Sequence, residues 1–148
     1  MKKTNTLTKV LAVTGTVLVW LPIVAPLVFA VVALATRGQL RLDYLMPAEL
    51  FPLALVGGAL LLWAALRARL RRRLIGWAFV LMPVLLIASQ GLAVATGLAS
   101  GETQTGGWEW VAVLVLLAGF TLAMIVLGVA GVLLVRDLFR RDETRAGE

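Results

Sequence analysis

The sequence of 148 residues contains no cysteine and no histidine. The absence of cysteine excludes disulfides and thiol redox chemistry, and without either residue type the chain offers no thiolate or imidazole ligand to a metal. Nucleophilic pairs of the Ser-His and Cys-His kinds are excluded for the same reason. We therefore expect no catalytic residue, no metal site and no cofactor.

Charged residues are also scarce, at 15% of the chain, and they are absent from four long segments. The hydrophobic share is 61% and the mean hydropathy is +0.97, whereas a soluble domain is about half apolar and a quarter charged. A helix needs about 20 residues to cross a hydrocarbon core of about 30 Å. Each uncharged segment is long enough to cross once, and these segments cover residues 10–36, 50–66, 74–101 and 110–135.

These segments predict an all-α integral membrane protein, because backbone polar groups in lipid must be paired within their own segment. We predict a bundle of four transmembrane helices with spans at about residues 10–36, 48–66, 74–98 and 110–135. Residues 1–9 would then precede a single membrane domain at 10–135, and residues 136–148 would form a tail. No Asp, Glu, Lys or Arg lies inside any of the four uncharged segments, which argues against proton-coupled transporters, pumps and voltage sensors.

Basic residues predict how the chain is oriented. Lys and Arg accumulate on the cytoplasmic side of membrane proteins, because short positively charged loops resist translocation. Placing the arginine-rich loop 67–73 inside puts both termini inside, together with twelve of the fourteen basic residues; only Arg37 and Arg41 remain outside. We therefore predict a multi-pass protein of the cell membrane with both termini cytoplasmic. Because this rule explains the net charge of +6, we expect no nucleic-acid partner.

The same loop predicts contact with acidic lipid. Each basic side chain near an anionic leaflet contributes about 1 kcal/mol of attraction. The expected partners are therefore the bilayer itself and anionic lipid headgroups. The candidate contact residues are the five arginines of the loop, Arg67, Arg69, Arg71, Arg72 and Arg73.

Prolines mark possible kinks within the spans. Pro22 and Pro26 lie four residues apart near the middle of the first span, and Pro83 lies in the third. Each removes a helix hydrogen bond and clashes with the preceding turn. We expect a static bend that improves packing, and a hinge or gate is the alternative. Trp20, in the same part of the first span, needs a hydrogen-bond partner for its indole N–H.

The first span also has some features of a signal peptide, since a basic start precedes it and Ala33-Leu34-Ala35 offers a small-residue cleavage site. The apolar region of a signal peptide usually runs about 7 to 15 residues, whereas this uncharged run is 27 residues long. We therefore expect an uncleaved span, and cleavage after that site is the alternative.

Small and polar side chains within the spans predict helix packing. Ala54 and Gly58 are four residues apart in the second span, and Gly119 belongs to a similar pair in the fourth. Small residues let helices approach closely, and packing drives association in lipid. The third span carries Ser89, Gln90 and Thr96. We expect them to hold helices together by hydrogen bonds, and the wall of a water-filled vestibule is the alternative.

Two functions are consistent with this sequence. The first is a non-catalytic accessory or structural component of a membrane complex, which packs against a larger membrane protein or against itself as a homo-oligomer. The second is an oligomeric channel or facilitator for a small solute, since such a protein needs no charge within the membrane. The small-residue faces and the lack of ionisable groups favour the first.

Overall fold

The computed structural model describes residues 6–37, 50–101 and 106–146, and the regular secondary structure in these residues is helical. There are four long helices among them, and each lies over one of the uncharged segments. All four are long and apolar enough to cross a membrane, which confirms the prediction of four apolar helices. Their bounds are α1 Thr6–Arg37, α2 Phe51–Ala68, α3 Arg72–Ala95 and α4 Trp108–Ala146.

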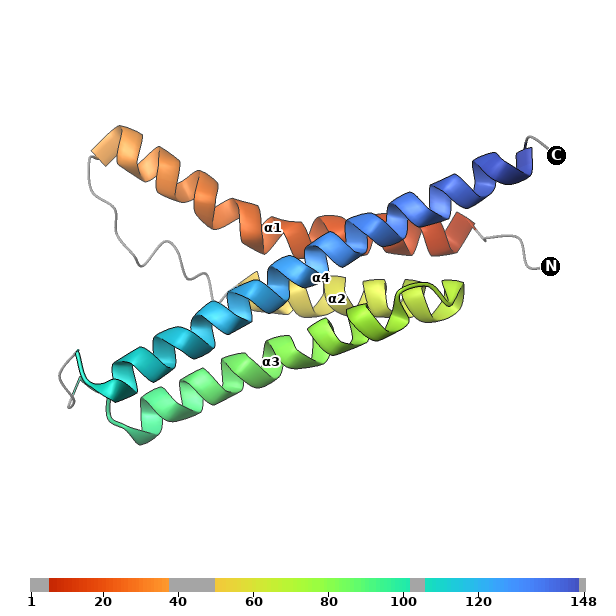
Figure 1. Ribbon diagram of the computed structural model, residues 1–148. Coiled ribbons are helices and arrows are strands. Elements are labelled where there is room, and N and C mark those ends of the chain that lie inside the picture. The colour runs from red at the N-terminus through yellow and green to blue at the C-terminus, as the bar shows by residue number, and fades with distance from the viewer. Residues whose placement is uncertain (1–5, 38–49, 102–105, 147–148) are drawn as a thin grey trace.

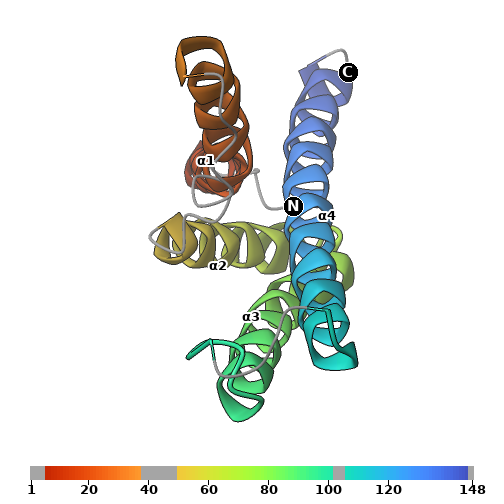
Figure 2. The same ribbon diagram turned by 90° about the vertical axis from the view of Figure 1, so that its left-hand side faces the viewer.

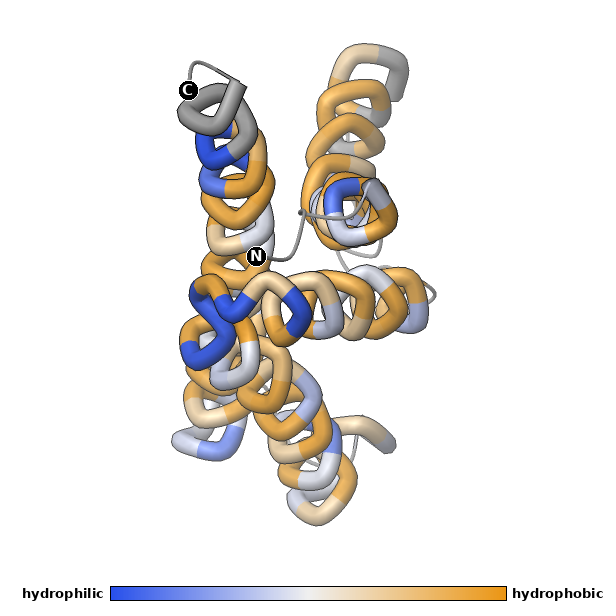
Figure 3. Tube along the Cα trace, turned by 90° about the vertical axis from the view of Figure 1, so that its right-hand side faces the viewer, coloured by the Kyte–Doolittle hydropathy of each residue, from blue (hydrophilic) through white to orange (hydrophobic). Residues whose placement is uncertain are grey.

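The helices form two antiparallel pairs, in which α1 packs mainly on α2 and α3 mainly on α4 (Figure 1). The start of α1, the end of α4 and the turn between α2 and α3 lie together at one end of the molecule, which we call the arginine end. Seen from that end, the hydrophilic segments gather there (Figure 3). The described parts of the three predicted cytoplasmic segments therefore lie at the same end of the molecule.

Most of the fully buried side chains lie towards the arginine end. Figure 1 shows that α1 bends near its middle, where Pro22 and Pro26 lie, and then runs away from α3 and α4. From the opposite end, the four helices spread outwards (Figure 2). The core consists of the first half of α1, the first half of α3, the second half of α4 and much of α2. Its largest fully buried side chains are Val19, Leu61, Ile75, Met82, Leu127, Leu134 and Leu138.

Glycines allow the closest contacts between α1 and α2. A Cβ atom added to Gly57 would lie 3.0 Å from the carbonyl oxygen of Gly15, and one added to Gly15 would lie 2.8 Å from the carbonyl oxygen of Gly57. The two backbones therefore touch directly at this crossing. Dispersion contacts of this kind favour helix association where lipid surrounds the protein.

The turn between α2 and α3 is short because two arginines adopt left-handed backbone conformations, Arg69 at φ 54° and Arg71 at φ 49°. The Leu70 N–H donates to the Ala65 carbonyl at 3.2 Å, and the Arg69 N–H donates to the Leu66 carbonyl at 3.4 Å. This is the Schellman pattern of helix termination. It reverses the chain within three residues and projects the arginine side chains outwards.

Candidate functional site

The polar residues predicted to join helices, two on α3 and Thr96 at its C-terminal cap, lie in different surroundings. Ser89 is fully buried, and its hydroxyl donates to the Leu86 carbonyl of the same helix at 2.8 Å. The Thr96 hydroxyl likewise donates to the Leu92 carbonyl at 2.7 Å. Gln90 is exposed, and its amide makes no hydrogen bond among the residues that the structure describes. Gln90 therefore points towards the surroundings of the molecule.

The interior around these residues is apolar. Thr8 and Ser89 are the buried polar side chains among the described residues, and no buried side-chain nitrogen or oxygen in that part of the chain lacks a partner. Neither residue continues into a polar path along the core, because the other buried side chains there are aliphatic or Met.

The small residues singled out in the sequence contact the chain's own helices. Ala54 is fully buried in the core. Gly58 lies under the ring of Phe79 in α3, and a Cβ atom on Gly119 would lie 3.3 Å from Leu85, also in α3. These three positions are therefore occupied by contacts within one chain. The sequence could not show this, because small residues occur on faces of all four helices.

Packing also accounts for the prolines and the central tryptophan. Pro22 and Pro26 are buried at the bend of α1, whereas Pro83 is half-buried within α3. Trp20 donates its indole N–H to the carbonyl of Gly128 in α4 at 3.3 Å. The bend therefore begins close to a side-chain hydrogen bond between α1 and α4.

Two contacts tie the elements of the arginine end together. Arg71 donates from Nε to the Asp137 carboxylate at 2.8 Å, which joins the turn to α4. The Lys9 ammonium lies 4.7 Å from the ring centroid of Phe139, which joins α1 to α4. Sequence reasoning missed the pairing of Arg71 with Asp137, since 66 positions separate them.

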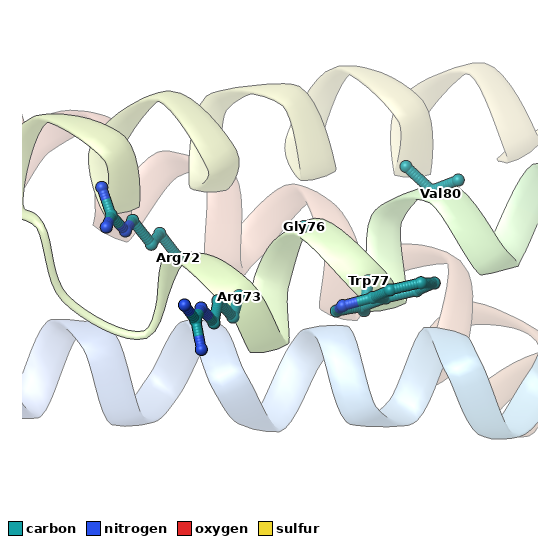
Figure 4. Close-up of a pocket in the computed structure, with 5 residues that line it drawn as sticks. All are labelled: Arg72, Arg73, Gly76, Trp77 and Val80. Atoms are coloured by element: carbon teal, nitrogen blue, oxygen red, sulfur yellow. The ribbon is translucent and has the colours of Figure 1, made fainter.

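The five arginines of the turn therefore differ in their surroundings. Arg72 and Arg73 make no ion pair within the described residues and line a shallow groove of about 390 Å³ along the start of α3. The groove continues past Gly76 to Trp77 and Val80. Figure 4 shows the two guanidinium groups at one end, and the indole and the valine further along the helix. Arg67 and Arg69 are exposed and do not line it.

Comparison of the chain with protein-family models, with curated proteins and with solved structures finds no match. Among the described residues there is no group of three or more acidic, cysteine or histidine side chains that could hold a metal ion. Three features of the described surface could contact other molecules: the divergent half of α1, the exposed Gln90 and the groove at Arg72 and Arg73.

Proposed function

We propose that this protein is a non-catalytic component of a complex in the cell membrane, where it packs against another membrane protein through the divergent half of α1. One observation carries the proposal. Beyond the bend, exposed apolar side chains cover more than half of the circumference of α1. They are Leu27, Val28, Phe29, Val31, Val32 and Leu34.

This half of α1 contributes no residue to the core among the described residues. In lipid it is soluble, but lipid alone gives no reason for α1 to leave the other helices. Helices in membranes associate through extended close packing, and a divergent arm offers a partner two faces at once. The bend at Pro22 and Pro26 sets the direction of this arm.

The proposed orientation places the arginine end in the cytoplasm. Its support is the adjacency of the α2–α3 turn, the start of α1 and the end of α4 at that end (Figure 1), combined with the preference of Lys and Arg for the cytoplasmic side. α4 has 39 residues, so it is about 58 Å long at 1.5 Å per residue. Its final turns then extend beyond the membrane into the cytoplasm.

Photo-crosslinking tests the partner interface. A photoreactive amino acid at Val31, on the arm, is expected to give a specific crosslinked product in native membranes. The matched control is the same amino acid at Val56, an exposed apolar residue of α2. Mild-detergent purification followed by identification of co-purifying chains should recover the same partner. Equal crosslinking from both positions, or no stoichiometric partner, would contradict the proposal.

The second candidate is a solute facilitator assembled from several copies, and the exposed Gln90 is the observation that favours it. Copies that meet through this face of α3 would place an amide at the interface. Purified protein in liposomes would then raise permeability to small polar solutes, and Gln90→Leu would abolish that flux while leaving assembly intact. Unchanged permeability with wild-type protein would eliminate this candidate.

A further inference from the structure

We propose that the groove formed by Arg72, Arg73, Gly76, Trp77 and Val80 is a binding site for one anionic phospholipid. The site rests on the membrane placement proposed above, but it does not depend on a protein partner. It assigns distinct roles to arginines that the sequence groups together.

The positive charge of the groove lies at the end that Arg72 and Arg73 form. Arg71 is neutralised by Asp137 at 2.8 Å, whereas Arg72 and Arg73 are exposed and have no acidic partner among the described residues. Both line the same groove. Guanidinium groups bind phosphate oxygens through charge-assisted, often bidentate, hydrogen bonds. Arg72 and Arg73, which are neighbours in the sequence at one end of the groove (Figure 4), therefore each offer a guanidinium to a phosphodiester that has no compensating ammonium group.

The groove changes from charged to apolar along its length. Arg72, Gly76 and Val80 follow one another at spacings of four residues, as do Arg73 and Trp77, so both rows run along α3. From Arg72 to Val80 the rise is about 12 Å. The polar interfacial layer on each side of a bilayer is only about 5 to 8 Å thick. A groove with arginine at the surface therefore reaches apolar Val80 within the hydrocarbon.

The shape of the groove also suits a lipid. Gly76 has no side chain, and a Cβ atom there would meet only Leu62 at 3.7 Å, so the hollow between Arg72, Trp77 and Val80 stays open (Figure 4). Trp77 is 74% exposed, and its indole forms a flat apolar wall with an N–H at the depth where tryptophan prefers to lie. An acyl chain below a bound phosphate would lie along this wall. A phospholipid therefore fits this groove better than free phosphate or a polynucleotide does, because it has both a phosphate and an acyl chain.

Lipid titration of the full-length protein in a non-ionic detergent tests this site. Native mass spectrometry would measure the apparent Kd for phosphatidylglycerol and for phosphatidylcholine. We expect phosphatidylglycerol to bind about thirtyfold more tightly, which corresponds to roughly 1 kcal/mol from each of the two arginines. The double variant Arg72→Gln/Arg73→Gln is expected to lose that preference.

The matched control is Arg67→Gln/Arg69→Gln, which removes the same charge from the same turn but leaves the groove intact. It should change the apparent Kd for phosphatidylglycerol less than threefold. Equal losses in the two double variants would show diffuse charge attraction and overturn the site. Competition by inorganic phosphate or by a short oligonucleotide at concentrations comparable to the lipid would overturn the assignment to lipid.

A second readout does not depend on charge. Phosphatidylglycerol with brominated acyl chains should quench the fluorescence of Trp77, measured as the difference between wild type and Trp77→Phe. Brominated phosphatidylcholine at the same concentration should quench it much less. Quenching of this component by both lipids alike would contradict a headgroup-selective site. Circular dichroism of each variant checks that its helices are intact, and the single variants Arg72→Gln and Arg73→Gln replace the double variant if it does not fold.

Discussion

At the scale of single residues, the five tryptophans divide into one that packs inside the chain and four that face outwards. Trp63, Trp77, Trp108 and Trp110 are all exposed, as expected for aromatic residues near membrane interfaces. Trp20 instead contacts Gly128, whose missing side chain lets the indole approach the α4 backbone. The half-buried indole N–H thus has a backbone acceptor in α4.

The Trp20 contact predicts a small and specific loss of stability. Trp20→Phe removes the hydrogen-bond donor while keeping an aromatic ring, and it should lower the free energy of unfolding by about 0.6 kcal/mol, with an upper value near 2. Unfolding in mixed micelles of rising dodecyl sulfate content would measure this loss. Trp63→Phe, at an exposed position, should change stability less. An equal or larger loss from the Trp63 variant would refute this account.

The α2–α3 turn predicts opposite effects for one substitution at two nearby residues. Arg69 holds a left-handed conformation, which costs an L-residue roughly 1 to 2 kcal/mol but costs glycine little. Arg67 lies in the last turn of α2, where glycine is unfavourable by about 1 kcal/mol. Arg69→Gly should therefore raise the midpoint of thermal unfolding in detergent, and Arg67→Gly should lower it. Shifts of the same sign would contradict the assigned turn.

At the scale of helices, the decisive feature is which small-residue face meets which partner. Gly15 and Gly57 bring α1 and α2 into backbone contact, whereas Gly128 and Gly131 receive Trp20 and Thr16 of α1. The α1 helix is thus held to two neighbours in its first half. Beyond the bend, α1 runs away from α3 and α4 (Figure 1).

Close backbone contact predicts that even one methyl group is harmful at the α1–α2 crossing. A Cβ on Gly57 would lie 2.8 Å from the Cβ of Leu18, so Gly57→Ala should cost about 1 to 3 kcal/mol through overpacking. Gly91→Ala is the matched control, because nothing lies within 4 Å of its added Cβ and alanine favours helix. Dodecyl sulfate titration would compare the two variants. Similar stabilities would show that this crossing is not tightly packed.

At the scale of the whole molecule, packing and charge are concentrated at the same end. The core lies where the arginine turn, the start of α1 and the end of α4 meet (Figures 1 and 3). The other end is open, because α1 leaves the remaining helices. One end therefore carries the close packing and the charge, and the other exposes mainly apolar side chains.

The orientation predicts the outcome of reporter fusions in a bacterial host. Alkaline phosphatase should be inactive when joined after Glu148 and active when inserted after Gly101, since the enzyme needs the disulfides that form only outside the cytoplasm. Green fluorescent protein at the C-terminus should fluoresce. An active phosphatase at the C-terminus would reverse the assigned topology and move the arginine groove to the outer leaflet.

Helix number could be predicted from the sequence, but helix ends and neighbours could not. Uncharged runs indicate where apolar helix must lie, yet α1 begins at Thr6, ahead of Lys9, and α4 continues to Ala146 past several charged residues. A helix outside lipid ends where its capping interactions end, and charge does not determine that point. The sequence also could not predict what Gln90, Ala54 and Gly58 contact. Residue spacing shows which residues share a helix face, but it does not show which helix packs against that face.

The sequence by itself determined that the chain has four apolar helices. A segment that crosses hydrocarbon must lack charge and pair its own backbone groups, so each crossing is visible as an uncharged apolar run. Only the tertiary structure decided that Gly57 contacts Gly15, that Arg71 is neutralised by Asp137, and that Arg72 and Arg73 remain available beside Trp77. Small residues and arginines recur along the chain. Which of them meet depends on how the helices cross in three dimensions.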